Sequence, residues 1–176
     1  PSKVELKTTA TDKEDGDKVI AAKGGTVVDR VDYQGLTPGA EYTIAGDLMD
    51  KATGKSVAKS LLTFTPEAAD GSVELEFKVG KSDAAKKLVV FERAFEGKVT
   101  IDKGNNTFVD EDGKTVVDEN GEFVEGGKTP VADHTDINDK AQTVTQGDDV
   151  PGNGGEEPSL KTTATDKEDG DKVIAA

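Results

Sequence analysis

The stretch Ser72–Val79, SVELEFKV, alternates apolar and charged side chains without a break. This period of two is that of a β-strand with one buried face. The same alternation recurs at residues 4–11 and 27–33, and turn formers such as Pro38-Gly39 separate the runs. Residues 87–95, KLVVFERAF, are apolar on both faces, as expected for a central strand. Many short strands with frequent turns predict an all-β protein, an immunoglobulin-like β-sandwich.

Residues 105–127 depart from this pattern. They hold two hairpin signals, Asp112-Gly113 and Asn120-Gly121, each flanked by short apolar pairs. We expect an extra, polar β-hairpin ribbon inserted into the sandwich and lying outside its core. A short helix is expected near residues 82–86.

An internal repeat divides the chain. Residues Leu6–Ala22 read LKTTATDKEDGDKVIAA, and Leu160–Ala176 read the same letters. Residues 145–159, which precede the second copy, are rich in Gly, Pro and acidic residues, as linkers are. We therefore expect a domain at residues 1–147, a linker at 148–159, and the first strand of the next tandem repeat at 160–176.

The composition excludes several classes of function. Lys and Arg total 22 and Asp and Glu total 36, giving a net charge of −14, which disfavours nucleic acid and anionic membranes as partners. The chain has no Cys and one His, so we expect no disulfide, no thiolate catalysis, no metal centre and no cofactor. No apolar run approaches the length of a membrane span, so we expect no membrane insertion.

Acidic clusters at residues 12–17 and 110–113 raise the question of calcium. Calcium loops of the EF-hand kind need Asp-x-Asp-x-Asp-Gly and a distal Glu, and neither cluster has that spacing. Solvated turns that keep strand edges soluble are the favoured interpretation.

Five residues carry possible chemistry. Thr8 shares its strand face with apolar residues of the first strand, and Gln142 falls in what alternation makes the final strand. Asp29 lies between two valines on an apolar face, and Glu92 is embedded in LVVFERAF, where it points either out of the sheet or into the core. His134 is the single histidine.

At this point four motifs carry a resemblance. They are, in order, LKTTATDKEDGDK, VVDRVDYQGLTPGAEYTIAGDLMDKATGK, LVVFERAF and ADHTDINDKAQTV. Together they resemble the VaFE-repeat family, the immunoglobulin-like stalk domains of Gram-positive surface adhesins that form an internal Thr–Gln ester bond. The resemblance covers nearly all of residues 4–146.

The resemblance implies a role for each of these residues. A threonine of TTAT would be the nucleophile, Gln142 the electrophile and His134 the proton shuttle. Asp29 and Glu92 would be the supporting buried acids.

Three threonines belong to the TTAT motif. Alternation places Thr8 on the core face and both Thr9 and Thr11 on the other face, which favours Thr8. Thr11 is the second choice, because a β-bulge between the two would reverse the faces.

The resemblance therefore implies a structural stalk domain that crosslinks its first and last strands and releases ammonia. The reaction turns over once, so the protein is not an enzyme in the ordinary sense. Its expected partners are adjacent tandem copies, with no host ligand identified and a monomeric state. The expected location is extracellular and cell-wall-anchored, with the anchor and signal outside this chain.

Two alternatives remain open. One is a ligand-binding β-sandwich module that uses the acidic hairpin insertion at 105–127. The other is a hydrolase that uses Thr8, His134 and an acid as a triad.

Overall fold

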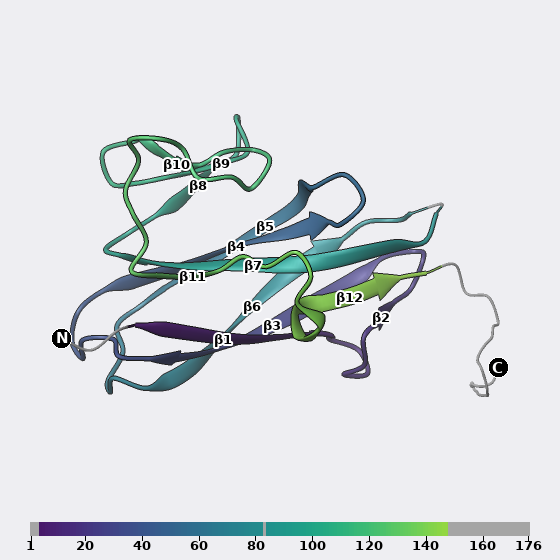
Figure 1. Cartoon of the computed structure of the whole chain (residues 1–176), viewed down its shortest axis with the longest axis horizontal. Coiled ribbons are helices and arrows are strands. Elements are labelled where there is room, and N and C mark those ends of the chain that lie inside the picture. The colour runs from purple at the N-terminus through teal and green to yellow at the C-terminus, as the bar shows by residue number, and fades with distance from the viewer. Residues whose placement is uncertain (1–3, 83, 148–176) are drawn as a thin grey trace. The chain divides into compact units, whose positions relative to one another are not determined.

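Strands dominate the computed structural model, which describes residues 4–82 and 84–147 (Figure 1). The strands and the single 3-10 turn of this described part are β1 (Glu5–Asp12), β2 (Val19–Ile20), β3 (Gly25–Gln34), β4 (Tyr42–Asp50), β5 (Lys55–Phe64), β6 (Gly71–Val79), β7 (Lys86–Glu96), β8 (Thr100–Asp102), β9 (Thr107–Val109), β10 (Thr115–Val117), β11 (Ala132–His134), η1 (Lys140–Gln142) and β12 (Thr143–Gln146).

Two sheets enclose the main core. One has the strand order β1-β3-β6, and the other has the order β2-β12-β7-β4-β5 with β11 paired to β7 (Figure 1). Apolar side chains from both sheets form one cluster, which includes Val31, Phe77, Ile44, Val90 and Val144. The predicted immunoglobulin-like β-sandwich is confirmed.

Strand β3 shows how the sequence pattern makes this core. Its side chains alternate between buried and more exposed from Val27 to Tyr33, so Asp29 faces inward together with its apolar neighbours. Strand β1 pairs with β3 in an antiparallel register that sets Thr8 opposite Val31 and Ala10 opposite Asp29.

A third sheet has the order β10-β9-β8. It joins β9 and β10 of the inserted ribbon to β8, which precedes the ribbon in the chain. Phe108, Val116 and Val117 are buried in a second apolar cluster with Ala45 of β4 and Phe95 of β7. The hairpin ribbon is present as predicted, but the expectation that it is polar and lies outside the core was wrong. Its apolar pairs are too short for alternation to reveal which face they bury.

The ribbon explains why the central strands are apolar on both faces. All of β4 is buried, and so are nearly all residues of β7 from Leu88 to Phe95. Along β7, Glu92 shares the sandwich face with Val90 and Ala94, whereas Arg93 and Phe95 face the ribbon.

Two local predictions were wrong. The described residues of the segment 82–86 form no helix, and Lys86 instead begins β7. Gln142 does not lie in the final strand but in the 3-10 turn η1, immediately before β12. Asp139 causes this turn, because its side chain accepts a hydrogen bond from the backbone N–H of Ala141 at 2.9 Å.

The described chain divides into two compact units. One holds residues 4–20, 25–80 and 86–145, and with them every predicted site residue. The other includes residues 21–24, 81–82, 84–85 and 146–147. Within it, Gln146 Nε2 donates to the Ala21 carbonyl at 3.1 Å, and the backbone N–H of Ser82 donates to the Ala22 carbonyl at 2.9 Å.

The predicted linker at 148–159 and the repeated strand at 160–176 lie outside the described residues. Within residues 4–82 and 84–147, no helix has the length and apolar character needed to span a bilayer.

Candidate functional site

Thr8 occupies the middle of β1 on its core-facing side. Its side chain is 2% exposed, and its Oγ1 has no hydrogen-bond partner. Thr9 is exposed and Thr11 is half-buried. A buried hydroxyl without a partner costs free energy, so such a group calls for an explanation.

Asp29 and Glu92 bring two carboxyl groups together in the core. Asp29 comes from β3 of one sheet and Glu92 from β7 of the other, and both are fully buried. Burial raises the pKa of Glu92 well above its usual range, and the neighbouring Asp29 raises it further. Burial also raises the pKa of Asp29, although the adjacent Glu92 and Gln142 side chains act in the opposite direction.

The raised pKa values favour a proton on at least one acid of this pair. If both acids were ionised, their oxygens would find no donor among the described residues and would repel each other. A proton held by one carboxyl supplies a hydrogen bond to the other and removes the repulsion. The two groups therefore titrate as a unit.

Gln142 is also fully buried, and its amide is fixed in one orientation. Its Nε2 donates to the carbonyl oxygen of Val90 on β7 at 3.0 Å, while its Oε1 has no partner. The turn that carries Gln142 contacts β1, the strand of Thr8, and the Gln142 side chain lies close enough to Asp29 to affect the pKa of that acid.

His134 closes the site from β11, which pairs with β7 so that His134 lies opposite Glu92. Its Nε2 hydrogen-bonds to a carboxylate oxygen of Asp139. Partial burial acts to raise the pKa of Asp139. The hydrogen bonds from His134 and from the backbone of Ala141 outweigh it and lower this pKa below its usual range. An ionised Asp139 can only accept in this contact, so the contact fits a His134 that carries a proton on Nε2.

The structure thus brings together all five residues that the sequence singled out. Among the described residues, eight buried side-chain polar atoms lack a hydrogen-bond partner, and six of them belong to Thr8, Asp29, Glu92 and Gln142. Arg93 Nε and Thr107 Oγ1 are the other two. Unpartnered polar groups are therefore concentrated at one place in the core.

Sequence reasoning missed three supporting residues. Asp139 lies in the same motif as His134, and its spacing of five residues from His134 was the available signal. Lys18 Nζ donates to the carbonyls of Ala10 at 2.5 Å and Ala141 at 2.8 Å, joining the strand of Thr8 to the turn of Gln142. No sequence pattern indicates this bridge.

Gly46 is the third missed residue. It lies on β4 opposite Glu92, and a Cβ there would come within 2.6 Å of Glu92 Oε1 and 2.7 Å of Phe77 Cζ. Glu92 occupies the space that a side chain at position 46 would fill.

Away from this site, Asp12, Asp15 and Asp17 place carboxylate oxygens within 4.8 Å of one another. Burial and a hydrogen bond with Asp15 raise the pKa of Asp17 to about 7. The carboxylates accept backbone hydrogen bonds within their own turn, such as that from Glu14 N–H to Asp12 Oδ1 at 3.2 Å.

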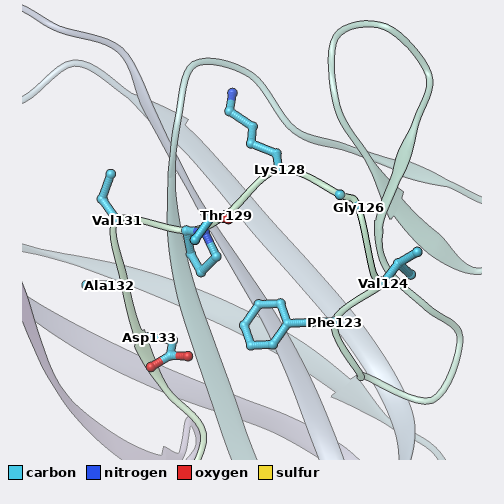
Figure 2. Close-up of a pocket in the computed structure, with 10 residues that line it drawn as sticks. Phe123, Val124, Gly126, Lys128, Thr129, Val131, Ala132 and Asp133 are labelled. Carbon is cyan, nitrogen blue, oxygen red and sulfur yellow. The ribbon is translucent and has the colours of Figure 1, made fainter.

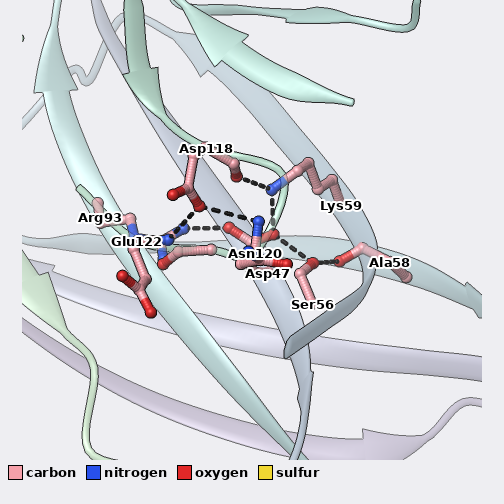
Figure 3. Close-up of polar contacts among 9 residues, drawn as sticks. Asp47, Ser56, Ala58, Lys59, Arg93, Asp118, Asn120 and Glu122 are labelled. Atoms are coloured by element: carbon pink, nitrogen blue, oxygen red, sulfur yellow. Dashed lines mark hydrogen bonds and ion pairs between the residues drawn. The ribbon is translucent and has the colours of Figure 1, made fainter. Parts of the chain in front are cut away.

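A buried ion cluster fixes the ribbon to the sandwich (Figure 3). Asp47 on β4 accepts hydrogen bonds at 2.5 Å from both Arg93 and Lys59. Arg93 also donates to the Gly121 carbonyl at 2.5 Å, and Lys59 donates to the Asp118 carbonyl at 2.9 Å. Both cations thus bind the second hairpin turn of the ribbon.

A surface groove of about 490 Å³ runs beside the ribbon, between Phe123 and Asp133 (Figure 2). Its lining includes the side chain of Phe123, which is 43% exposed, but none of the five predicted site residues.

The sequence profile of the family described as "T-Q ester bond containing domain" matches residues 4–146. A search of the curated proteins found no match.

Two solved structures of a bacterial adhesin from Mobiluncus mulieris resemble the fold. Both are described as containing intramolecular disulfide, isopeptide and ester bond cross-links. The first has a TM-score of 0.62 at 20% identity and covers 84% of this chain and 58% of the adhesin chain. The second has a TM-score of 0.55 at 20% identity, with 82% and 57% covered. The chain thus spans less than two thirds of those adhesin chains, and at this identity the likeness shows the fold.

The profile match covers the strand that holds the candidate nucleophile and the 3-10 turn that holds the candidate electrophile, together with the candidate acids between them. With Thr8 and Gln142 buried beside a pair of acids in a sandwich of this kind, the chain belongs to the T-Q ester bond containing domain family.

Proposed function

We propose that this domain is a structural stalk module of a surface adhesin, held shut by an ester bond that it forms between Thr8 and Gln142. The observation that carries this proposal is the cluster of buried, unpartnered oxygens on Thr8, Asp29, Glu92 and Gln142. Buried oxygens without hydrogen-bond partners destabilise a fold. Such groups gather at sites where they react, and this supports a reaction here.

His134 activates the nucleophile. Asp139 holds the Nε2 proton of the imidazole, so Nδ1 takes the proton from Thr8 Oγ1 as that oxygen attacks Gln142 Cδ. The imidazolium then stands beside an ionised Asp139, which stabilises its charge.

The acid pair activates the electrophile. The proton shared by Asp29 and Glu92 is donated to Gln142 Oε1 as that oxygen gains negative charge. The hydrogen bond from Gln142 Nε2 to Val90 keeps the amide oriented for the attack.

The reaction needs no other reactant. The Oγ1–Cδ bond forms, Oε1 returns its proton to the acid pair as the Cδ–Nε2 bond breaks, and the proton held by His134 leaves with the nitrogen as ammonia. The product is one ester per domain, and the reaction is a single turnover rather than enzymatic catalysis.

Burial of the site supports crosslinking over hydrolysis of an external substrate. Thr8, Asp29 and Glu92 are each at most 2% exposed, and the surface groove near the ribbon is lined by other residues. The same exclusion of water protects the ester once it has formed.

The ribbon leaves Phe123 exposed beside the groove, but three of its other apolar residues are not available to a ligand. Its apolar residues Phe108, Val116 and Val117 pack against β4 and β7, so they stabilise the domain rather than form an exposed anchor for a partner.

The proposed setting is a shaft of tandem copies on the outside of a Gram-positive cell wall. The repeat of residues 6–22 at 160–176 and the fold shared with a bacterial adhesin support it. In such a shaft, force passes from β1 to η1 through covalent bonds, and the core carries no load. The partners are then neighbouring copies within one chain.

Intact mass measurement tests the reaction. The folded wild-type chain is expected to weigh one ammonia less than its sequence mass, with the missing mass located by fragmentation to a Thr8–Gln142 linkage. Thr8→Ala and Gln142→Ala should each restore the full sequence mass.

Thr9→Ala is the matched control, because Thr9 is the adjacent threonine on the exposed face. It should crosslink like wild type. Full sequence mass in a well-folded wild-type chain would refute the proposal.

A further inference from the structure

Two neighbouring residues of β7, Glu92 and Arg93, face opposite cores. Glu92 belongs to the cluster of buried, unpartnered groups between the two main sheets, whereas Arg93 reaches the ribbon. Strand β4 is divided in the same way. Gly46 lies opposite Glu92 and leaves space for it, and the next residue, Asp47, binds Arg93. The reactive cluster and the ion cluster thus lie back to back on the same two strands, and a shift of either strand displaces both.

Arg93 is the side chain of β7 that binds the ribbon most directly. It is fully buried, and its Nη1 donates to Asp47 Oδ2 and its Nη2 to the Gly121 carbonyl, both at 2.5 Å (Figure 3). The guanidinium carbon also lies 5.5 Å from the centre of the Phe123 ring. A planar guanidinium holds two acceptors at once in a fixed geometry. Arg93 therefore fixes the second hairpin turn of the ribbon on β4 and β7.

The ribbon is followed in the chain by the strand that carries His134. Strand β11 begins at Ala132, soon after the ribbon of residues 105–127 ends, and it has three residues (Figure 1). Its pairing with β7 sets His134 opposite Glu92. So short a strand has few contacts of its own, and its position therefore depends on the segments that flank it. On its N-terminal side, that segment is the docked ribbon.

We propose that Arg93 is a positioning residue for ester formation: by holding the ribbon on β4 and β7, it keeps His134 and Glu92 where they can act on the reacting groups. The inference rests on the proposed ester chemistry. Arg93 faces away from the reactive cluster and takes no part in the bond-forming step. Ester formation then follows docking of the ribbon, so that only a domain with a folded insertion becomes crosslinked.

Charge is the competing explanation for an effect of Arg93. Burial raises the pKa of Glu92, and the positive charge of Arg93 acts in the opposite direction. Arg93→Lys separates position from charge, because it keeps a cation beside Asp47 and loses the fork that also reaches the Gly121 carbonyl. Arg93→Met removes both. The rates are compared at the optimum pH of each variant.

Leu36→Ala is the matched control for a general loss of stability. Leu36 is buried in a third apolar cluster, with Tyr33 and Tyr42, and its truncation destabilises the domain without removing a contact of the ribbon. All variants are studied under conditions in which they are folded.

The first measurement is the rate of crosslinking. A short pulse of cell-free synthesis yields chain that has not yet reacted, and intact mass then follows the loss of ammonia with time. Arg93→Met should react about tenfold or more slowly than wild type, because small displacements of reacting groups are costly. Arg93→Lys should fall between the two, and Leu36→Ala should react like wild type.

The second measurement uses His134, the single histidine of the chain, whose imidazole signals in an NMR spectrum report on one residue. The spectra are recorded in a Gln142→Ala background, where the proposed ester cannot form. Both Arg93 variants should shift these signals toward those of an exposed histidine. Leu36→Ala should leave them in place, because it weakens the core without releasing β11.

A wild-type rate in Arg93→Lys would assign the effect to charge and overturn the inference. Unshifted His134 signals in the Arg93 variants, or equal slowing in Leu36→Ala, would overturn it as well. If Arg93→Met does not fold, Arg93→Lys decides alone. Full sequence mass in the wild-type chain refutes the proposed ester instead, and the His134 signals still test whether Arg93 positions β11.

Discussion

At the scale of single residues, Asp29 and Glu92 are two acids buried in the core, where burial favours the protonated form of a carboxyl group. Each is an acid whose ionised form would be costly at its position, and each comes from a different sheet. Packing the sheets together therefore buries two acids whose pKa values are raised. In the proposed reaction, this arrangement, which costs stability, supplies the proton donor.

Asp29→Asn should slow crosslinking about 100-fold or more, the usual loss when a general acid is removed. The fold should persist, because the substitution replaces a buried ionisable group with a neutral one of the same shape. The measurement is the fraction of chain that has lost ammonia, followed by mass spectrometry during refolding. Asp32→Asn on the opposite face of β3 is the control, and a rate equal to its rate would contradict the role of Asp29.

Gly46→Ala should both destabilise the domain and slow the reaction. The new Cβ would overlap Glu92 Oε1 and Phe77 Cζ, so one of them must move. We expect the free energy of unfolding to fall by about 1–3 kcal/mol, as for other overpacked cores. Gly80→Ala is the control, because a Cβ at Gly80 has no atom within 4 Å. Chemical denaturation of the two variants in a Gln142→Ala background measures the difference, and equal midpoints would contradict it.

At the scale of elements, the site depends on holding β1 against η1. Lys18 makes this connection through backbone carbonyls, so it acts by positioning and not by chemistry. Partial burial lowers the pKa of Lys18 below its usual range, although the nearby Asp29 and Asp139 oppose this. The second connection between elements is the ion cluster that holds the ribbon on β4, β5 and β7 (Figure 3).

Lys18→Met should slow ester formation, because the strand of Thr8 and the turn of Gln142 lose the bridge between them. Lys18→Arg should recover part of the rate, since a guanidinium can reach both carbonyls. Because Lys18 also lowers the pKa of Asp29, the rate of ammonia loss is compared at the optimum pH of each variant, with Lys13→Met as a control at an exposed ion pair of 2.9 Å with Glu76. A rate in Lys18→Met equal to that in Lys13→Met would contradict the positioning role.

Arg93→Met should detach the second hairpin turn of the ribbon. Arg93 is fully buried, and its loss leaves Asp47 with Lys59 as its remaining cation and the Gly121 carbonyl without its donor. We expect a loss of about 3 kcal/mol in the free energy of unfolding and faster amide hydrogen exchange in residues 118–124. Arg30→Met, at an exposed pair with Asp32, should change neither. Unchanged exchange in Arg93→Met would show that apolar packing alone holds the ribbon.

At the scale of the whole molecule, the proposed bond between residues 8 and 142 would close a loop of about 135 residues. By the loop-entropy estimate used for disulfides, this would contribute roughly 5 kcal/mol. A cysteine-free domain would thereby gain a covalent crosslink comparable to a disulfide.

The pH dependence of stability should follow from the acids with raised pKa values. Asp29, Glu92 and Asp17, whose pKa is about 7, hold protons in the folded domain at pH values where the unfolded chain has lost them. The free energy of unfolding contributed by these acids should therefore fall as the pH rises from about 4 to 7.

Asp17→Asn should reduce this fall in the free energy of unfolding, because it removes an acid whose pKa is raised to about 7 in the folded domain. Urea unfolding of Gln142→Ala, with and without Asp17→Asn, at pH 5 and pH 8 measures the effect. Asp102→Asn is the control of opposite sign, because hydrogen bonds with Asn105 lower the pKa of Asp102. An equal pH dependence with and without Asp17→Asn would contradict the assignment.

The sequence by itself determined the strand content and the core face of β1 and β3, because period-two burial is a local property, and it singled out the five candidate site residues. It left Glu92 between two orientations, since a strand that is apolar on both faces carries no period. It misplaced Gln142, because the Asp139 cap overrides alternation within a single turn.

Only the tertiary structure decided what these residues face. The ribbon buries Phe108, Val116 and Val117 because β4 and β7 offer them a second apolar face, which no local pattern shows. Glu92 points inward because Gly46, far away in the chain, leaves space for it. The pKa values of Asp29 and Glu92 are raised mainly because the two packed sheets bury both carboxyl groups, and that burial does not follow from the local sequence of either residue.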